Sequence, residues 1–112
     1  MESGRLKKVN KLLQKELGIL FQQESKTLFQ GAFITVTEVR CSPDLSYAKA
    51  FLSFFMVKDN KALLKLIDEQ KSVIRNKIGQ LIKNQIRVIP EFDFRIDDSL
   101  DRAMRIDELL KK

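Results

Sequence analysis

Residues 32–57 read AFITVTEVRCSPDLSYAKAFLSFFMV, and this stretch decides the fold. Residues 32–41 and 47–57 are rich in Val, Ile, Thr and Phe, residue types that favour strands. Between them lies a short turn at residues 42–45, in which Pro43 presets the backbone dihedral. Two strands joined by a short turn pair antiparallel, so the stretch predicts a β-hairpin.

The alternation of side chains predicts which face of each strand is buried. In the second strand one face is apolar without interruption, which marks the core side: Ala48, Ala50, Leu52, Phe54 and Met56. In the first strand the apolar residues change face after Val36, because Val39 and Cys41 fall on the other side. An extra residue near Glu38, forming a β-bulge, would return them to one face.

The opposite face of the second strand carries three aromatic residues, Tyr47, Phe51 and Phe55. Exposed aromatic rings on a sheet are able to stack nucleic-acid bases. Rings in this position are more often covered by another element of the fold, and we expect covering here.

Before the hairpin, residues 3–22 predict an amphipathic helix. Its apolar residues recur every three or four positions and form one face: Leu6, Val9, Leu13, Leu17 and Leu20. The opposite side carries a stripe of lysines: Lys7, Lys8, Lys11 and Lys15. One face therefore packs on the domain and the other presents positive charge to solvent.

After the hairpin, residues 59–82 predict a helical segment with a break in it. Asp59 or Asn60 provides the N-cap, and five apolar residues keep one helical phase: Leu63, Ile67, Ile74, Ile78 and Leu81. In a regular helix Lys71 would point into this apolar face. A kink at residues 70–72, with Ser72 capping the second half, removes that conflict. The alternative is a single unbroken helix of about 25 residues.

Residues 86–96 predict the last strand, because every even position is apolar: Ile86, Val88, Pro90, Phe92, Phe94 and Ile96. Pro90 lacks an N–H group and requires a bulge or an unpaired edge position. A short final helix follows, with capping residues at its start and lysines at its end: Asp97, Asp98, Ser99, Lys111 and Lys112. The order of elements predicts one α+β domain over residues 1–112.

Two absences in the composition exclude most enzyme chemistries. The chain has no histidine, so His-based acid–base catalysis, nucleophile pairs with His and His-ligated metals are excluded. Its one cysteine, Cys41, forms no internal disulfide and no thiolate cluster. The adjacent Asp97 and Asp98 suit a helix cap better than a magnesium site. We therefore expect no catalysis, no metal and no cofactor.

No apolar run approaches the roughly 20 residues that a membrane-spanning helix needs. The first 15 residues carry five basic side chains and no apolar core, which is unlike a secretory signal. We expect neither a membrane span nor a signal peptide.

Basic residues are concentrated in two segments of the chain. Lys and Arg number 21 against 15 Asp and Glu, a net charge of +6. Residues 1–17 carry five basic and two acidic side chains, and residues 69–89 carry five and one. Positive charge on folded segments favours a polyanion such as RNA. The first candidates are the stripe of lysines, Lys7, Lys8, Lys11 and Lys15, followed by Arg75, Lys77 and Lys83 and then by Arg87 and Lys49.

Three blocks of the sequence resemble one family. They are VRCSPDLSYAKA at residues 39–50, Ile74-Arg75, and IRVIPEFDF at residues 86–94 followed by Asp97 and Ser99. In this order and spacing they are similar to the bacterial ribosome-binding factor A family, over about residues 5–110. The kink of that family usually carries Ala-x-Gly, whereas the matching residues here are Gln70-Lys71-Ser72.

The resemblance implies a KH-like fold of type II, with a kinked helix pair between the second and third strands. It implies a non-catalytic cytoplasmic factor, monomeric when free, without a small-molecule substrate. Its partner would be the immature small (30S) ribosomal subunit with its 16S rRNA, whose late maturation it would assist, above all in the cold. Two alternatives are a general KH-like RNA-binding protein and a protein–protein adaptor whose basic helix docks an acidic partner.

Overall fold

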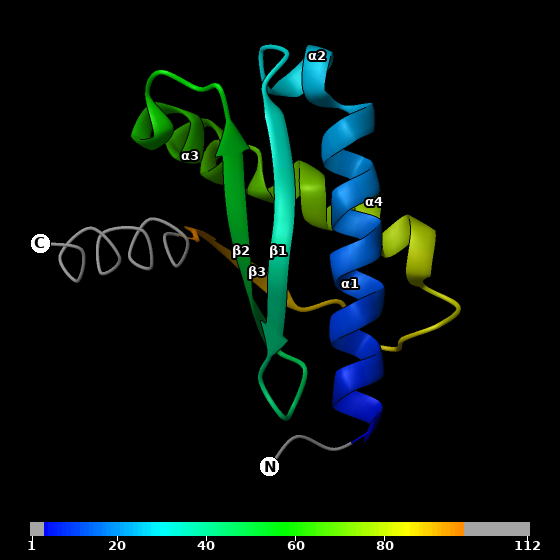
Figure 1. Cartoon of the computed structure of the whole chain (residues 1–112). Coiled ribbons are helices and arrows are strands. Elements are labelled where there is room, and N and C mark those ends of the chain that lie inside the picture. Colours follow the sequence, from blue (N-terminus) through cyan, green and yellow to red (C-terminus); the bar gives the residue numbers. More distant parts are fainter. Residues whose placement is uncertain (1–3, 98–112) are drawn as a thin grey trace, which may run out of the picture.

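The computed structural model describes residues 4–97. The elements are α1 (Gly4–Gln23), α2 (Ser25–Leu28), β1 (Phe33–Cys41), β2 (Tyr47–Phe55), α3 (Asn60–Glu69), α4 (Lys71–Ile82) and β3 (Glu91–Ile96). The strands form one sheet in the order β1-β2-β3, with β1 and β2 antiparallel and β2 and β3 parallel (Figure 1). The α+β class is confirmed. The final helix expected after Asp97 lies outside the described residues.

The hairpin contains the predicted bulge. The register of β1 against β2 shifts between Val36 and Glu38, so Thr37 is the extra residue. The bulge turns Val36 and Val39 to the same face, and both are buried there. The irregular alternation of β1 therefore has the predicted cause.

In the turn between β1 and β2, a single carboxylate binds the backbone and side chains of its neighbours. Asp44 Oδ1 accepts hydrogen bonds from the Ser42 hydroxyl at 2.7 Å, the Ser46 hydroxyl at 2.8 Å and the Ser46 N–H at 3.1 Å. The two serine side chains are the main reason why the pKa of Asp44 falls from 3.8 to about 2. The turn is thus fixed by an ionised carboxylate in addition to Pro43.

β2 ends two residues before the predicted boundary. Its inward residues Ala48, Ala50 and Leu52 are fully buried, as predicted. Met56, which the alternation assigns to the core side, is instead 88% exposed. Its φ of 56° takes the backbone out of the strand conformation. The prediction for Met56 is wrong because a turn, and not the alternation of a strand, sets the direction of this side chain.

β3 begins at Glu91 and not at residue 86. Pro90 has no N–H group to donate to a strand ladder, and β3 starts directly after it. Val88, predicted to point inward, is 49% exposed, whereas Phe92 is buried as predicted. The alternating pattern before Pro90 therefore belongs to a connecting segment, and the prediction of a strand there is wrong.

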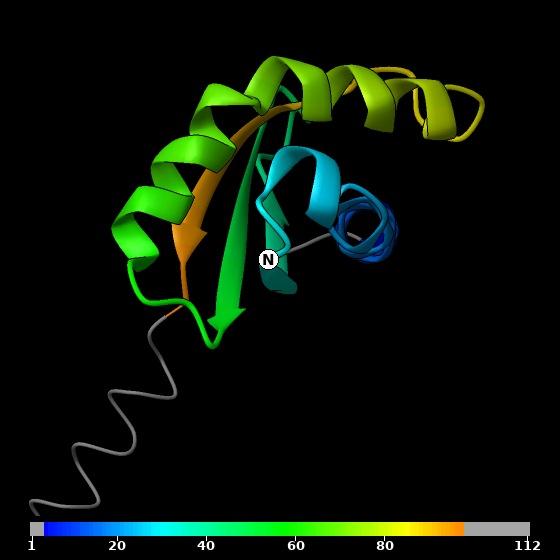
Figure 2. The ribbon, with the colours of Figure 1, turned by 90° about the horizontal axis from the view of Figure 1, so that it is seen from above.

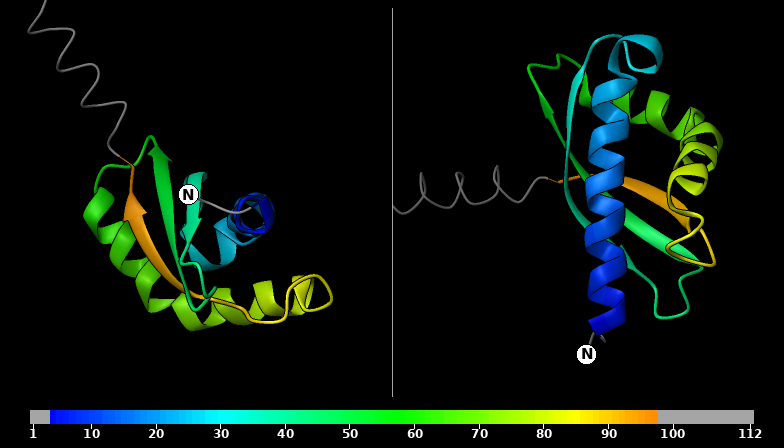
Figure 3. Two further views of the ribbon diagram at one scale, coloured as in Figure 1. Left: turned by 90° about the horizontal axis from the view of Figure 1, so that it is seen from below. Right: turned by 90° about the vertical axis from the view of Figure 1, so that its right-hand side faces the viewer.

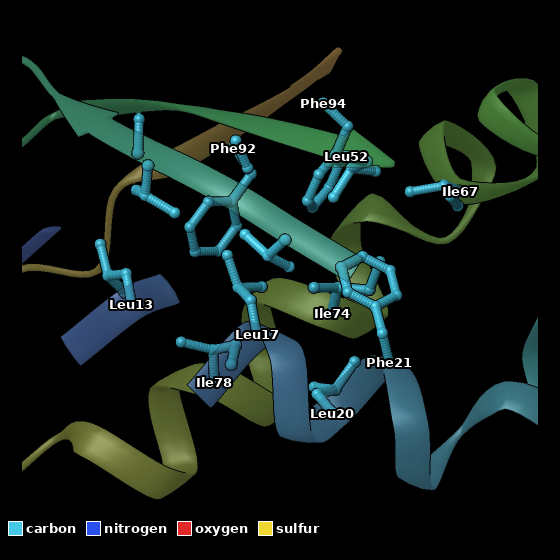
Figure 4. Close-up of a cluster of buried hydrophobic side chains, with 14 of the residues drawn as sticks. Leu13, Leu17, Leu20, Phe21, Leu52, Ile67, Ile74, Ile78, Phe92 and Phe94 are labelled. Atoms are coloured by element: carbon cyan, nitrogen blue, oxygen red, sulfur yellow. The ribbon is translucent and has the colours of Figure 1, made fainter. Parts of the chain in front are cut away.

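The core lies between the sheet and the helices. α1 packs lengthwise along β1, as the right-hand view of Figure 3 shows, and its five predicted apolar residues are all buried. Side chains from α1, from the sheet and from the bent helix pair converge in Figure 4, among them Leu17, Phe92 and Ile78. Phe21 joins this cluster at the end of α1, with its ring 5.9 Å from that of Phe94. The buried residues of α1, β2 and β3 thus meet in one core.

The helical segment is bent at Gln70, and Figure 2 shows α3 and α4 as the two arms of an arch. The Gln70 N–H donates to the carbonyls of Ile67 at 3.0 Å and Leu66 at 3.2 Å, a tightened last turn of α3. The Gln70 carbonyl then accepts from the Ile74 N–H at 2.9 Å and starts α4. With φ at −95°, Gln70 needs no glycine for this bend.

The kink is therefore present, but its predicted cap is wrong. Gln70 is the N-cap of α4 and makes no hydrogen bond with its side chain, and Ser72 lies inside α4 as an exposed helical residue. The helix bends through the backbone of Gln70, so it needs no hydroxyl to restart it. The cap of α3 is as predicted, because Asp59 Oδ1 accepts from the Ala62 N–H at 3.0 Å.

Within residues 4–97, no helix covers the outer face of the sheet. α1, α3 and α4 all lie on the side toward which the buried strand residues point, and β1 and β2 lie uncovered at the front of Figure 1. Tyr47 is 38% exposed and Phe55 is 66% exposed. Phe51 is half-buried. The expectation that another element covers the rings is therefore wrong for Tyr47 and Phe55 within the described part of the chain.

Candidate nucleic-acid interface

The predicted lysine surface of α1 exists as one exposed strip. We call Lys7, Lys8, Lys11 and Lys15 the α1 lysine surface; all four are exposed. The buried leucines on the other side of α1 fix this orientation, because the helix cannot rotate without exposing them. Among the described residues, none of the four lysines forms an ion pair. Four positive charges are therefore available to an external partner.

Two predicted cations on α4 bind groups of the protein itself. The Arg75 guanidinium donates to the Ile89 carbonyl at 2.7 Å and to the Pro90 carbonyl at 3.2 Å. The Lys77 ammonium lies 3.1 Å from the Glu24 carboxylate, at the junction of α1 and α2. Both side chains thus hold chain segments together, which weakens their candidacy as nucleic-acid contacts. Whether either contacts a partner stays a prediction.

Lys83 and Arg87 occupy different places from each other. Lys83 is exposed at the end of α4. Arg87 borders a shallow depression together with Arg5 and Val88, so it lies beside the start of α1. Arg87 therefore lies near the N-terminal end of α1, whereas Lys83 lies at the C-terminal end of α4.

A cleft between α4 and β3 brings the selected Arg75 and Lys83 together with Lys71, which the sequence analysis did not select. Its volume is about 810 Å³, and α4 lines it with Lys71, Ser72, Arg75, Asn76, Gln80 and Lys83. Tyr47, Glu91 and Asp93 line the strand side. A signal was present in the sequence, because residues 71, 75, 79 and 83 are four apart and share one helix face. The sequence analysis selected Lys77 and not Lys71, so it did not recognise this shared helix face.

The strand side of the cleft carries a polar network. Asp93 Oδ2 accepts from the Tyr47 hydroxyl at 2.8 Å and from Arg95 Nε at 2.9 Å. Partial burial opposes ionisation of Asp93, but these two hydrogen bonds hold its pKa below the ordinary value. The same hydrogen bond to Asp93 raises the pKa of Tyr47. Asp93 is therefore an anion at neutral pH, and with Glu91 it offsets part of the positive charge of the cleft.

Comparing the two surfaces identifies the stronger candidate for a polyanion. The cleft combines three cations with two carboxylates, whereas the α1 lysine surface presents four cations free of ion pairs among the described residues. Phosphate contacts need accessible positive charge before anything else. The α1 lysine surface therefore satisfies the electrostatic requirement better than the cleft does.

Two other kinds of site are absent from residues 4–97. No helix of that part is both long enough and apolar enough to cross a membrane. No three Cys, Asp or Glu side chains of that part gather as metal ligands.

The element order, the bent helix pair and the mixed three-stranded sheet define a KH-like α+β domain, a class used widely for binding RNA. The family model for ribosome-binding factor A matches residues 5–110. The chain is 44% identical to ribosome-binding factor A of Cytophaga hutchinsonii over 112 residues, which is 100% of this chain and 84% of the relative. The protein belongs to the ribosome-binding factor A family.

Two solved structures share the fold. The crystal structure of ribosome-binding factor A from Thermus thermophilus has a TM-score of 0.67 at 17% identity, covering 80% of this chain and 92% of that one. A homology model of the same factor, fitted into an electron cryo-microscopy map of a 30S complex, has a TM-score of 0.61 at 22% identity. It covers 78% of this chain and 89% of that one. The KH-like architecture expected from the sequence is thereby confirmed.

Proposed function

We propose that the protein is a non-catalytic assembly factor that binds the immature small ribosomal subunit in the cytoplasm through the α1 lysine surface. Two observations support the partner: membership of the ribosome-binding factor A family, and a structural neighbour fitted into a 30S complex. The four exposed lysines, none of which forms an ion pair with a residue of the described segment 4–97, support the surface. This second observation carries the proposal, because it is a property of this chain.

The α1 lysine surface binds RNA by neutralising phosphates. Lys8 and Lys11 lie close together on the exposed side of one helix, with Lys7 and Lys15 extending the strip in both directions. Each lysine that contacts a phosphate releases a counterion, so the affinity falls steeply with salt concentration. Such contacts position the protein on the subunit without reading the base sequence.

The preference for the immature subunit follows from linkage. A binding factor favours one RNA conformation only to the extent that it binds this conformation more tightly than the others. The domain is held together by one apolar core, so we treat it as a rigid surface that fits a single arrangement of phosphates. Late rRNA maturation is then assisted because the factor holds the bound RNA conformation until assembly proceeds. At that point the arrangement of phosphates that fits the α1 lysine surface is lost.

The test compares two double variants of the full chain. Lys8→Ala with Lys11→Ala removes two charges from the α1 lysine surface, and Lys61→Ala with Lys65→Ala removes two exposed lysines with similar spacing from α3. Affinity for purified immature subunits is measured at several salt concentrations. We expect the first variant to bind more weakly, with a log–log salt slope reduced by about 1.5, and the second to bind like the wild type.

A second arm identifies the chemical nature of the partner. Digestion of the rRNA should abolish binding, whereas persistence of binding to the remaining proteins would favour the adaptor alternative. Equal affinity for naked unrelated RNA and for subunits would favour the general RNA-binding alternative. Wild-type affinity and slope in the Lys8→Ala, Lys11→Ala variant would move the interface to the cleft beside Lys71 and Lys83.

A further inference from the structure

The edge of the sheet at β1 is closed by two side chains of α1. Asn10 Oδ1 accepts a hydrogen bond from the Cys41 N–H at 2.9 Å. Gln14 Nε2 donates to the carbonyls of Val36 and Thr37 at the bulge, both at 3.3 Å. These contacts occupy backbone groups that an edge strand would otherwise present to another chain. β3 forms the other edge, beside the arch of α3 and α4 (Figure 2).

The pairing of β3 with β2 shows which backbone groups of β3 point away from the sheet. The Glu91 N–H donates to the Ser46 carbonyl at 3.1 Å. The Asp97 N–H donates to the Leu52 carbonyl at 2.7 Å, so the odd-numbered residues of β3 bond to β2. The N–H and carbonyl groups that point to the open edge are those of Phe92, Phe94 and Ile96. Among the hydrogen bonds within residues 4–97, none reaches these groups.

The cleft between α4 and β3 gives access to this edge. Phe92 lines the cleft although its side chain is 2% exposed and belongs to the core, so its backbone borders the open space. The Arg75 guanidinium donates to the carbonyls of Ile89 and Pro90 and thereby fixes the segment that leads into β3. A groove of about 810 Å³ therefore lies beside unpaired backbone groups.

The open edge offers N–H donors and carbonyl acceptors in alternation. An extended polypeptide carries both kinds of group at the same spacing and satisfies both, as in the addition of a strand to a sheet. The phosphates of a nucleic acid accept hydrogen bonds but cannot donate them. They would leave the carbonyls of Phe92 and Phe94 unpaired and facing negative charge. The edge therefore favours a polypeptide as its ligand.

The α4 wall of the cleft is positively charged. Lys71, Arg75 and Lys83 line it from one helix face. Arg75 donates to neutral carbonyls, which leave its charge uncancelled. Lys71 lies 4.0 Å from Asp68 in an exposed pair, and Lys83 forms no ion pair with any residue of the described segment. Side chains that face this wall should therefore be acidic.

The strand wall carries the opposite charge. Glu91 and Asp93 line it, and Asp93 is paired with Arg95 at 2.9 Å. Carboxylates of a ligand are thus favoured toward α4 and disfavoured toward Glu91. Successive side chains of an extended segment point to opposite sides, so acidic residues at every second position suit this cleft.

From this arrangement we infer that the edge of β3 is a docking site for an extended segment of another polypeptide. The segment pairs with Phe92 and Phe94 as a fourth strand and directs acidic side chains at alternate positions to Lys71 and Lys83. The inference is independent of the proposed binding of the small subunit, because α1 packs along β1 at the opposite edge of the sheet.

The test follows the backbone amide signals of the full chain by nuclear magnetic resonance. The probe is an eight-residue peptide with blocked ends that alternates glutamate with threonine. At millimolar concentration we expect it to shift the amide signals of Phe92 and Phe94 and to leave that of Cys41, on the closed edge, in place. The same peptide with every backbone nitrogen methylated keeps its charge but donates no hydrogen bond. It should bind at least tenfold more weakly.

A matched pair of variants tests the charge of the α4 wall. Lys71→Ala with Lys83→Ala should weaken binding of the acidic peptide several-fold, because the ligand loses two cations. Lys61→Ala with Lys65→Ala removes two exposed lysines of α3 and should leave the affinity unchanged. A peptide that alternates lysine with threonine should bind the wild type more weakly than the acidic peptide does.

Three outcomes would overturn the inference. The first is that the acidic peptide leaves the Phe92 and Phe94 signals in place, or that its methylated form shifts them equally. The second is that these signals shift on tenfold dilution of the protein alone, which assigns the edge to a second copy of the chain. The third is that a short oligouridylate shifts them at a lower concentration than the peptide does, which assigns the cleft to RNA.

Discussion

The Lys77 ammonium lies 3.1 Å from the Glu24 carboxylate, and this ion pair joins α4 to the junction of α1 and α2. The Lys77 side chain is 42% exposed and the Glu24 side chain 23% exposed, so solvent weakens the attraction without removing it. A residue selected from the sequence as a nucleic-acid contact thus has a partner 53 residues away in its own chain.

For this pair we predict a small and non-additive effect on stability. Lys77→Ala and Glu24→Ala should each lower the free energy of unfolding by about 0.2–1 kcal/mol, and the double variant should lose little more than either single one. Both losses should shrink at about 1 M salt, where exposed charges are screened. Urea denaturation measures all three variants, and strictly additive losses would show that the two side chains do not interact.

The two helix starts around the kink predict opposite results for two similar substitutions. Asp59→Ala removes the cap of α3 and should cost about 1 kcal/mol, because the Ala62 N–H loses its acceptor. Ser72→Ala should be neutral or stabilise by a few tenths of a kcal/mol, because Ser72 is an exposed position inside α4 and alanine is the better helix former. Thermal unfolding compares them, and a loss of about 1 kcal/mol for Ser72→Ala would restore its role as a cap.

The inward faces of β2 and β3 predict large losses on truncation. Leu52 is 0% exposed and Phe94 is 3% exposed, so Leu52→Ala and Phe94→Ala should each destabilise the domain by roughly 2–5 kcal/mol. Ser53, next to Leu52 on the exposed face, provides the matched control, and Ser53→Ala should stay within about 0.5 kcal/mol of the wild type. Unchanged denaturation midpoints for Leu52→Ala and Phe94→Ala would mean that the faces are assigned the wrong way round.

The turn carboxylate predicts a specific pH dependence. Hydrogen bonds from Ser42 and Ser46 favour ionised Asp44 and lower its pKa from 3.8 to about 2 in the folded protein. Their contribution is therefore complete above pH 3.8 and disappears as the pH falls through about 2. The difference in the free energy of unfolding between wild type and Asp44→Ala should be constant near neutral pH. It should then decrease as the pH falls from 3.8 to about 2. Melting temperatures at several pH values measure it, and a difference that persists below pH 2 would contradict this account.

Local patterns were sufficient for α1 and for the bulge of β1. The three- and four-residue spacing of leucines determined α1 and its lysine surface, because a helix rotates each residue by a fixed angle. The change of face of the apolar residues after Val36 predicted the bulge, because side chains of a regular strand alternate strictly between the two faces. These features depend on near neighbours in the chain, which the sequence contains directly.

The alternation of apolar residues predicted the wrong face for residues that lie beyond the ends of their strands. Met56 and Val88 continue the period of their strands in the sequence, yet both are exposed in the structure. A positive φ at Met56 and the missing N–H group of Pro90 override the period at those points. The pattern predicts the face of a residue only as far as the strand extends.

The sequence by itself determined the α+β class, the buried face of α1 with its opposite lysine surface, and the family. Only the tertiary structure decided which cations are available, because the partners of Arg75 and Lys77 come from distant segments around Ile89 and Glu24. Only the tertiary structure showed that the Asp97 carboxylate accepts a hydrogen bond from the Thr37 hydroxyl of β1. The physical reason is that periodicity fixes the direction of a side chain from its neighbours, whereas hydrogen bonds and ion pairs between distant residues depend on how the elements pack.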